Sequence, residues 1–157
     1  MTLYHGTNME FDTIDLLKSK PNKDFGRGFY LSDNYSQALE MAKIKVEQLQ
    51  TGSPTVISYQ ADEALLDSMH ILRFEDYSEE WAKFILLNRR HADPEPAHDY
   101  DIVIGPIAND RVGVQLWKYE TNSIDLPTLV NKLRYMRGAT IQYFFGTERA
   151  IKLLHRL

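Results

Sequence analysis

The sequence contains no cysteine. This absence excludes disulfide bonds, thiolate zinc sites and a cysteine nucleophile. No apolar run approaches the length of a membrane-spanning helix, and Met1–Phe11 lacks the basic and apolar segments of a secretory signal. We therefore expect a cytoplasmic protein that makes no contact with a membrane.

Positive charge is scarce, with 18 lysines and arginines against 22 acidic residues and a net charge of −4. This balance disfavours a broad nucleic-acid surface, although a local contact needs no basic stripe. The two common glycine-rich nucleotide motifs and the His-Glu-x-x-His zinc motif are missing. The histidines are scattered, so the sequence predicts no metal site. They are His5, His70, His91, His98 and His155.

The length of 157 residues fits a single domain over residues 1–157 that folds without disulfides or metal. Strands are predicted over Thr2–Tyr4, Phe29–Leu31, Thr55–Tyr59, His70–Phe74, Tyr100–Gly105 and Thr140–Phe145. Helices are predicted over Asn34–Gln50, Ser78–Arg90, Asp110–Glu120, Asp125–Tyr135 and Thr147–Arg156. We expect Ser32 or Asp33 to cap the first of these helices, Ser78 the second and Thr147 the last. These elements show no regular βαβ rhythm. We therefore predict an α+β domain whose central mixed or split sheet is flanked by helices.

The first candidate motif is Leu3–Thr7, where His5 is followed by Gly6 at the end of a predicted strand. Glycine has no Cβ, so a planar ligand could approach the main chain closely at this point. The alternative is a histidine whose ring is satisfied within a turn.

The second candidate motif is Asp24–Asp33, in which two glycines flank Arg27 ahead of an aromatic strand. Strand alternation predicts that Phe29 and Leu31 pack inward while Tyr30 faces the other way. Arg27 could reach a diphosphate, or it could be an ordinary solvent-exposed loop residue.

The third candidate motif is Ala139–Phe145, where Gln142 interrupts an apolar strand. A buried amide must be hydrogen-bonded, whereas an amide at a sheet edge can bond to the main chain or to water. Asn109 and Asp110 follow a Gly-Pro turn after another strand, so they could contact a ligand or cap the next helix.

In this order, the three motifs resemble those of the ADP-ribosyltransferase superfamily, in its His-Tyr-Glu branch. The segment Tyr100–Asp110 is also similar to a motif of a bacterial family in that superfamily. The resemblance extends from His5 to the last predicted helix. It implies an ADP-ribosyltransferase-like fold and an NAD-dependent mono-ADP-ribosyltransferase. Such an enzyme cleaves the nicotinamide–ribose bond and transfers ADP-ribose to a protein or a nucleic acid.

The resemblance also assigns roles to individual residues. It places His5 on the adenosine-side ribose of NAD, the Gly6 main chain on the nicotinamide carboxamide, and the Tyr30 ring against nicotinamide. Gln142 takes the place of the residue that holds the nicotinamide-ribose 2′-hydroxyl. The predicted catalytic residues are therefore His5, Tyr30 and Gln142. The predicted NAD-binding residues are His5, Gly6, Thr7, Arg27, Gly28, Tyr30, Ser32, Asn109 and Asp110.

Two departures from the family pattern leave alternatives open. Gln142 stands where the family has glutamate, and an amide cannot act as a general base at pH 7. The chain could therefore be an NAD-binding module without catalysis, or an NAD glycohydrolase with water as acceptor. Larger relatives also place a serine and a tyrosine where this chain has Ala38 and Met41.

Glu148 follows Gln142 closely in the sequence, and we expect it in the first turn of the last helix. Its ordinary role there is to favour the helix dipole, and a catalytic role is the alternative. A compact transferase of this kind would also suit a bacterial toxin or effector that a small antitoxin or inhibitor protein masks.

Overall fold

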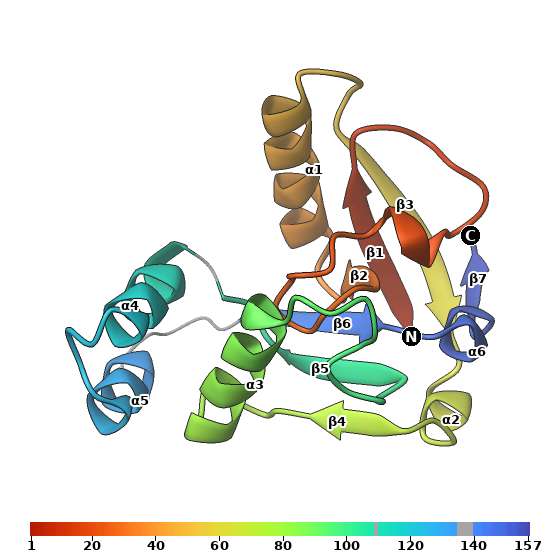
Figure 1. Cartoon of the computed structure of the whole chain (residues 1–157). Coiled ribbons are helices and arrows are strands. Elements are labelled where there is room, and N and C mark those ends of the chain that lie inside the picture. Colours follow the sequence, from red (N-terminus) through yellow and green to blue (C-terminus); the bar gives the residue numbers. More distant parts are fainter. Residues whose placement is uncertain (109, 135–139) are drawn as a thin grey trace.

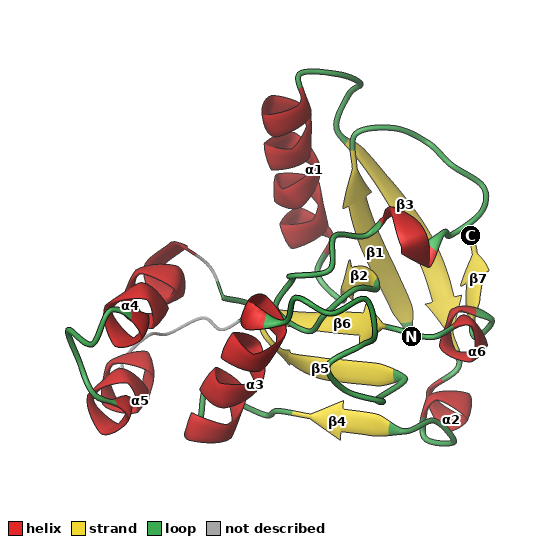
Figure 2. Ribbon diagram, in the orientation of Figure 1, coloured by secondary structure: helices red, strands yellow, loops and turns green. Residues whose placement is uncertain are grey.

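The computed structural model describes residues 1–108, 110–134 and 140–157. The fold is α+β, with helices flanking one seven-stranded sheet (Figures 1 and 2). The strands are β1 (Thr2–Thr7), β2 (Phe29–Ser32), β3 (Thr55–Ala61), β4 (Ile71–Arg73), β5 (Ile102–Pro106), β6 (Ile141–Phe145) and β7 (Leu154–Arg156). The helices are η1 (Leu16–Lys18, 3-10), α1 (Tyr35–Leu49), α2 (Glu63–Leu66), α3 (Glu79–Arg90), α4 (Asp110–Glu120), α5 (Leu126–Arg134) and α6 (Glu148–Ile151).

The sheet is mixed and divided into two halves. Its strand order is β4-β5-β6-β2-β1-β3-β7, and β4 and β5 are parallel while all other neighbours are antiparallel. β1 and β2 are joined at one residue pair, Tyr4 opposite Ser32. Figure 1 shows β1 and β3 crossing the direction of β4, β5 and β6 steeply. The prediction of a single domain with a central mixed or split sheet is therefore confirmed.

Two hydrophobic clusters cover opposite faces of the half-sheet β5-β6-β2. Phe29 and Leu31 belong to the cluster that reaches across to β1 and β3, whereas Tyr30 packs against the cluster beneath α3, α4 and α5. The predicted alternation along β2 is therefore confirmed. The face to which Tyr30 points is covered, however, so its ring is half-buried rather than open.

The helix caps differ in how well the sequence predicted them. Ser78 caps α3 as predicted, because its hydroxyl accepts a hydrogen bond from the Trp81 amide at 3.0 Å. For α1 we expected Ser32 or Asp33, but the cap is Asn34, whose side chain accepts from the Gln37 amide at 3.1 Å. The Ser32 hydroxyl instead accepts a hydrogen bond from the Asn34 amide.

The prediction of one long helix over Thr147–Arg156 is wrong. Thr147 caps a helix as expected, but that helix, α6, ends at Ile151. Leu154–Arg156 then forms β7, which pairs antiparallel with β3. Main-chain pairing with the open edge of β3 and burial of Leu154 outweigh local helix propensity here.

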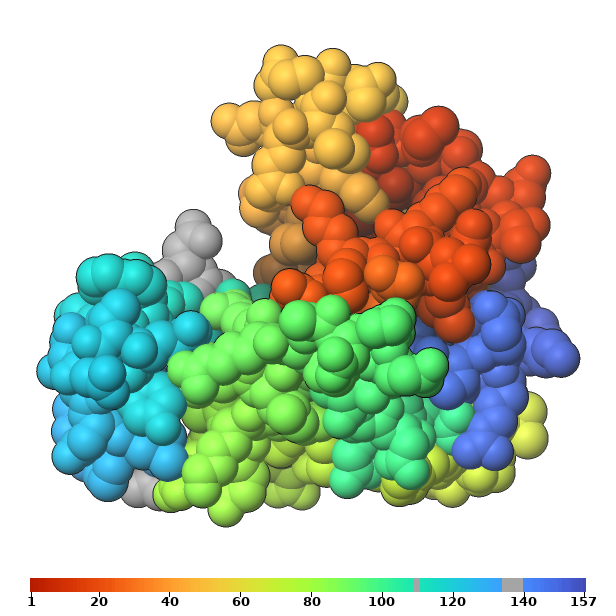
Figure 3. Space-filling model, in the orientation of Figure 1, coloured from red at the N-terminus to blue at the C-terminus, as the bar shows by residue number. Residues whose placement is uncertain are grey.

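The segment before β2 lies against the loop after α3 (Figure 3). Asp24 forms an ion pair with Arg89 of α3 at 2.7 Å, and the Phe25 carbonyl accepts a hydrogen bond from His98 Nε2 at 2.7 Å. These contacts fix the turn that carries the second motif. Among the described residues, no helix has both the length and the apolar character needed to cross a membrane.

Candidate ligand-binding site where the half-sheets meet

His5 is tied to the main chain of Tyr30 where the two half-sheets separate. His5 and Gly6 lie within β1, which runs to Thr7 rather than ending at Tyr4. His5 Nδ1 donates a hydrogen bond to the Tyr30 carbonyl oxygen at 2.7 Å, just beyond the last residue pair between β1 and β2. The imidazole also stacks on Phe29, with ring centroids 4.2 Å apart. These contacts orient the ring and leave Nε2 as its acceptor.

The environment of His5 keeps its ring neutral. Burial lowers the pKa of His5 to about 4, against the opposing effect of the bond to Tyr30, and Lys45 and Lys23 lower it further. At neutral pH, Nε2 therefore presents a lone pair. Such an atom accepts a hydrogen bond from a ligand hydroxyl and does not bind an anion.

The hydroxyl of Tyr30 is occupied within the protein. It donates to the Gly26 carbonyl at 2.6 Å and accepts from the Phe25 amide at 3.0 Å, which closes the turn before β2. Burial raises the pKa of Tyr30 well above its ordinary value. The ring is what this residue offers to a ligand, and Lys23 Nζ lies over that ring at 5.0 Å from its centroid.

Three lysines that the sequence analysis did not single out lie near one another, and two of them, Lys23 and Lys45, also lie near His5. Lys20, Lys23 and Lys45 form no ion pair with the rest of the described chain. Desolvation lowers the pKa of Lys23, and Lys45 and Lys20 lower it further by repulsion, while Asp24 opposes them. Desolvation alone lowers the pKa of Lys45. Three lysines therefore outnumber the one nearby carboxylate, Asp24, which is paired with Arg89, and this local excess of positive charge on an acidic protein favours an anionic ligand.

Gln142 lies on the same face of the sheet as Tyr30. It sits opposite Ser32 on β2 and opposite Gly105 on β5, while Tyr30 sits opposite Phe144 on the same strand as Gln142. Directly opposed residues share a face, so the side chains of Tyr30, Ser32 and Gln142 do so as well. Gln142 Nε2 is buried and has no hydrogen-bond partner within the described part of the chain. This free donor marks a position that a ligand acceptor would satisfy.

His5 and Gln142 are not on the same face. Tyr4 is opposed to Ser32, so His5 points to the other side of the sheet, where it packs on Phe29. Tyr30 connects the two positions, through its carbonyl to His5 and through its ring to the face of Gln142. A ligand that reaches all three residues must therefore be elongated.

Two of the predicted NAD-binding glycines have packing roles. A Cβ at Gly6 would lie 2.0 Å from the carbonyl oxygen of Ala38 on α1. A Cβ at Gly28 would lie 2.2 Å from the ring of Phe144. Both glycines are therefore needed for close approach within the protein, whether or not a ligand binds.

The remaining predicted residues fall into three groups. The side chains of Thr7 and Ser32 are buried, at 2% and 6% exposure. Asn109 lies outside the described residues, and Asp110 is the first residue of α4. Glu148 is exposed in the first turn of α6, in the position expected for a residue that favours the helix dipole.

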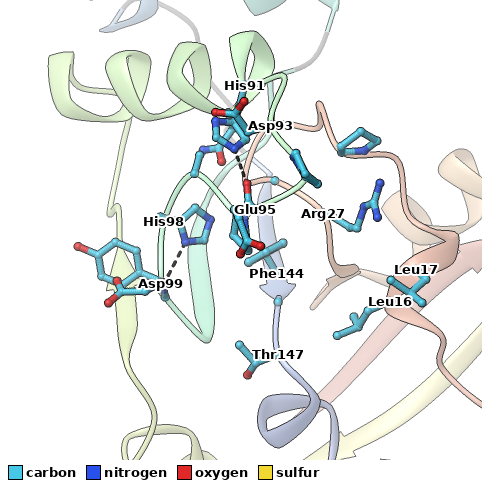
Figure 4. Close-up of a pocket in the computed structure, with 18 residues that line it drawn as sticks. Leu16, Leu17, Arg27, His91, Asp93, Glu95, His98, Asp99, Phe144 and Thr147 are labelled. Atoms are coloured by element: carbon cyan, nitrogen blue, oxygen red, sulfur yellow. Dashed lines mark hydrogen bonds between the residues drawn. The ribbon is translucent and has the colours of Figure 1, made fainter.

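Arg27 is directed elsewhere. It is exposed and lines a cavity of about 850 Å³ between the turn before β2 and the loop after α3 (Figure 4). Neither His5, Tyr30 nor Gln142 lines this cavity. The structure therefore brings Tyr30 together with His5 and Gln142, and it separates Arg27 from them.

Comparison with known proteins returns a family assignment. No curated protein and no solved structure matches the chain. One family model matches, and it covers residues 1–156. The chain therefore belongs to the family described as "Protein of unknown function (DUF3990)".

Proposed function

We propose that this protein is an NAD-dependent mono-ADP-ribosyltransferase with an ADP-ribosyltransferase-like fold. The observation that carries the proposal is the neutral His5 ring bonded to the main chain of Tyr30, with unpaired lysines around both residues. An aromatic face, a hydroxyl-accepting nitrogen and excess positive charge together suit a ligand with a flat ring, a sugar and phosphates. The motif resemblance selects NAD among such ligands.

The groups of NAD can be matched to the residues by chemistry. His5 Nε2 accepts a hydrogen bond from the adenosine-side ribose. Lys20 and Lys45 attract the diphosphate, and the nicotinamide ring stacks on Tyr30 once the flexible Lys23 side chain moves aside. The free Nε2 of Gln142 donates to the nicotinamide ribose. The elongated shape of the dinucleotide suits contacts on both faces of the sheet.

The reaction needs little covalent chemistry from the protein. The bond between ribose C1′ and the nicotinamide nitrogen breaks, and its electron pair neutralises the pyridinium. The ribose acquires oxocarbenium character, and an acceptor nucleophile bonds to C1′ and releases a proton to solvent. Lys23 beside the pyridinium disfavours its positive charge and so favours its departure. Catalysis of this kind comes from positioning and electrostatics, as in glycoside chemistry.

The test is the release of nicotinamide from NAD by the purified protein, with and without cell extract. We expect Lys45→Met and His5→Gln to weaken NAD binding and Tyr30→Ala to abolish release. The matched controls are Lys43→Met on α1 and His155→Gln on β7, and both should behave as wild type. Thermal unfolding of each variant separates loss of the site from loss of the fold.

Other results would redirect the proposal. Release that is independent of any macromolecule would identify an NAD glycohydrolase. Calorimetric binding of NAD without turnover would identify a non-catalytic NAD-binding module. If wild type and Tyr30→Ala were equally inactive and neither bound NAD, the proposal would be wrong.

A further inference from the structure

The cavity that Arg27 lines is a second candidate binding site. Its volume of about 850 Å³ lies in the range of ligand pockets. Figure 4 shows Arg27 on one side and His91, Asp93 and Glu95 on the other. Gly26 lines this cavity, and its carbonyl accepts the Tyr30 hydroxyl bond, so the cavity adjoins the first site.

The two histidines at this cavity hold the loop and are not free for a ligand. His98 Nε2 donates to the Phe25 carbonyl at 2.7 Å, and its Nδ1 accepts from the Tyr100 amide at 3.1 Å. His91 Nε2 donates to the carbonyl oxygen of Glu95 and so closes the loop on itself. These bonds fix the main chain that carries Asp93 and Glu95.

The groups left free on this side of the cavity are acceptors. The carboxylates of Asp93 and Glu95 form no hydrogen bond or ion pair with other described residues. Asn88 also lines the cavity and is 1% exposed. Its Nδ2 donates to the Phe84 carbonyl at 2.8 Å, which leaves Oδ1 buried without a partner.

The position of Asn88 Oδ1 indicates a ligand that carries hydrogen-bond donors. A Cβ at Gly26 would lie 3.1 Å from this oxygen, so Oδ1 faces the Gly26 side of the cavity. A buried acceptor without a donor costs stability. A ligand with N–H donors would satisfy this oxygen, and a positive charge on the ligand would satisfy the carboxylates.

We propose that this cavity binds a basic side chain of a protein partner. Its ammonium or guanidinium group pairs with Asp93 and Glu95 and donates to Asn88 Oδ1. Arg27 on the opposite side contacts the partner's main-chain carbonyls. If the proposed function holds, the partner is the acceptor of ADP-ribose, and the position of the cavity beside the Tyr30 turn suits that role.

The test measures peptide binding without NAD, so its outcome does not depend on catalysis. The probe is a Gly-Arg-Gly peptide with blocked termini. Its binding is measured by calorimetry or by chemical-shift changes in the NMR spectrum of the labelled protein. The citrulline version has nearly the same shape without the charge, and we expect its binding to be at least about tenfold weaker. Lysine should replace arginine with binding retained.

Variants of the protein identify the side chains that bind the peptide. We expect the double change Asp93→Asn and Glu95→Gln to weaken arginine-peptide binding about tenfold. The matched control, Glu47→Gln with Glu80→Gln, removes the same charge from exposed helix positions and should leave binding unchanged. Asn88→Leu should weaken binding without lowering the thermal midpoint, because it removes an unpaired acceptor.

Three results would overturn the proposal. One is equal binding of the arginine and citrulline peptides. Another is equal loss in the Asp93/Glu95 variant and in its control. The third is preferential binding of a blocked Gly-Glu-Gly peptide that is lost in Arg27→Gln, which would identify an anion site instead. If arginine-peptide binding were present but nicotinamide release absent, this inference would stand while the proposed function failed.

Discussion

Gly28 lies so close to the ring of Phe144 that a Cβ on the glycine would come within 2.2 Å of ring carbon Cε2. A Cβ on Gly146, which follows β6, would likewise come within 2.5 Å of Cε1 of the same ring. Phe144 is 2% exposed and also meets the ring of Tyr30 edge to face. The glycine of the second motif is thus required to seat an aromatic ring beneath Tyr30.

We therefore expect Gly28→Ala to destabilise the fold by about 2–4 kcal/mol, because the ring has no free space into which to move. Denaturant unfolding measures this change. Gly28→Ala should cost less stability in a Phe144→Leu background than in wild type, because the smaller leucine side chain leaves room for the added methyl group. Gly113→Ala on α4 is the matched control, since nothing lies within 4 Å of its Cβ position. It should stabilise by roughly 0.5–1 kcal/mol through helix propensity.

Asp101 is a buried carboxylate that joins three parts of the fold. It is 1% exposed, and it accepts hydrogen bonds from Thr147 at 2.6 Å, from Arg149 Nε at 2.7 Å and from the His70 amide at 3.0 Å. Arg149 is the main cause that lowers the pKa of Asp101 to about 2. We expect Asp101→Asn to cost about 3 kcal/mol, because the arginine and the hydroxyl lose a charged partner.

The same carboxylate predicts an acid transition. Its pKa is depressed in the folded state, so its contribution to stability is present above pH 4 and is lost as pH falls toward 2. Unfolding free energies measured between pH 5 and pH 2 should fall more steeply for wild type than for Asp101→Asn. Asp67→Asn, which breaks the exposed pair with Arg73, should keep the wild-type slope. Parallel curves for wild type and Asp101→Asn would contradict this prediction.

His5 predicts a different pH dependence of stability. Its pKa is about 4 when folded and about 6.5 when unfolded, so the unfolded chain binds the extra proton between these values. Stability should therefore be complete above about pH 6.5 and decline as pH falls toward 4, by up to roughly 3 kcal/mol. His5→Gln should remove this part of the slope, whereas the exposed His155→Gln should not. A wild-type slope in His5→Gln would show that folding does not depress the pKa of His5.

Local patterns predicted the elements that carry the site but not the contacts between them. Alternation correctly predicted that Phe29 and Leu31 lie on one face of β2 and Tyr30 on the other. This prediction succeeded because alternation depends only on the strand itself. The prediction of a helix through Leu154 was wrong because that segment pairs with the open edge of β3, which lies far away in the sequence. Lys23 lies over the ring of Tyr30, and Lys45 lies near His5. Both contacts likewise depend on how separate segments fold together. No spacing in the sequence reports such contacts.

The identity of the residue at position 142 gives the sharpest test of the proposed chemistry. Gln142 Nε2 has no partner in the described structure, so a carboxylate of the same shape fits without breaking an existing Nε2 hydrogen bond. A negative charge next to the nicotinamide ribose would stabilise its oxocarbenium character better than an amide does. We therefore expect Gln142→Glu to raise the rate of nicotinamide release at saturating NAD by about ten- to a hundredfold. Gln48→Glu on α1 adds the same charge at an exposed position and should leave the rate unchanged. Equal rates for wild type and a folded Gln142→Glu variant would place the reacting ribose away from β6.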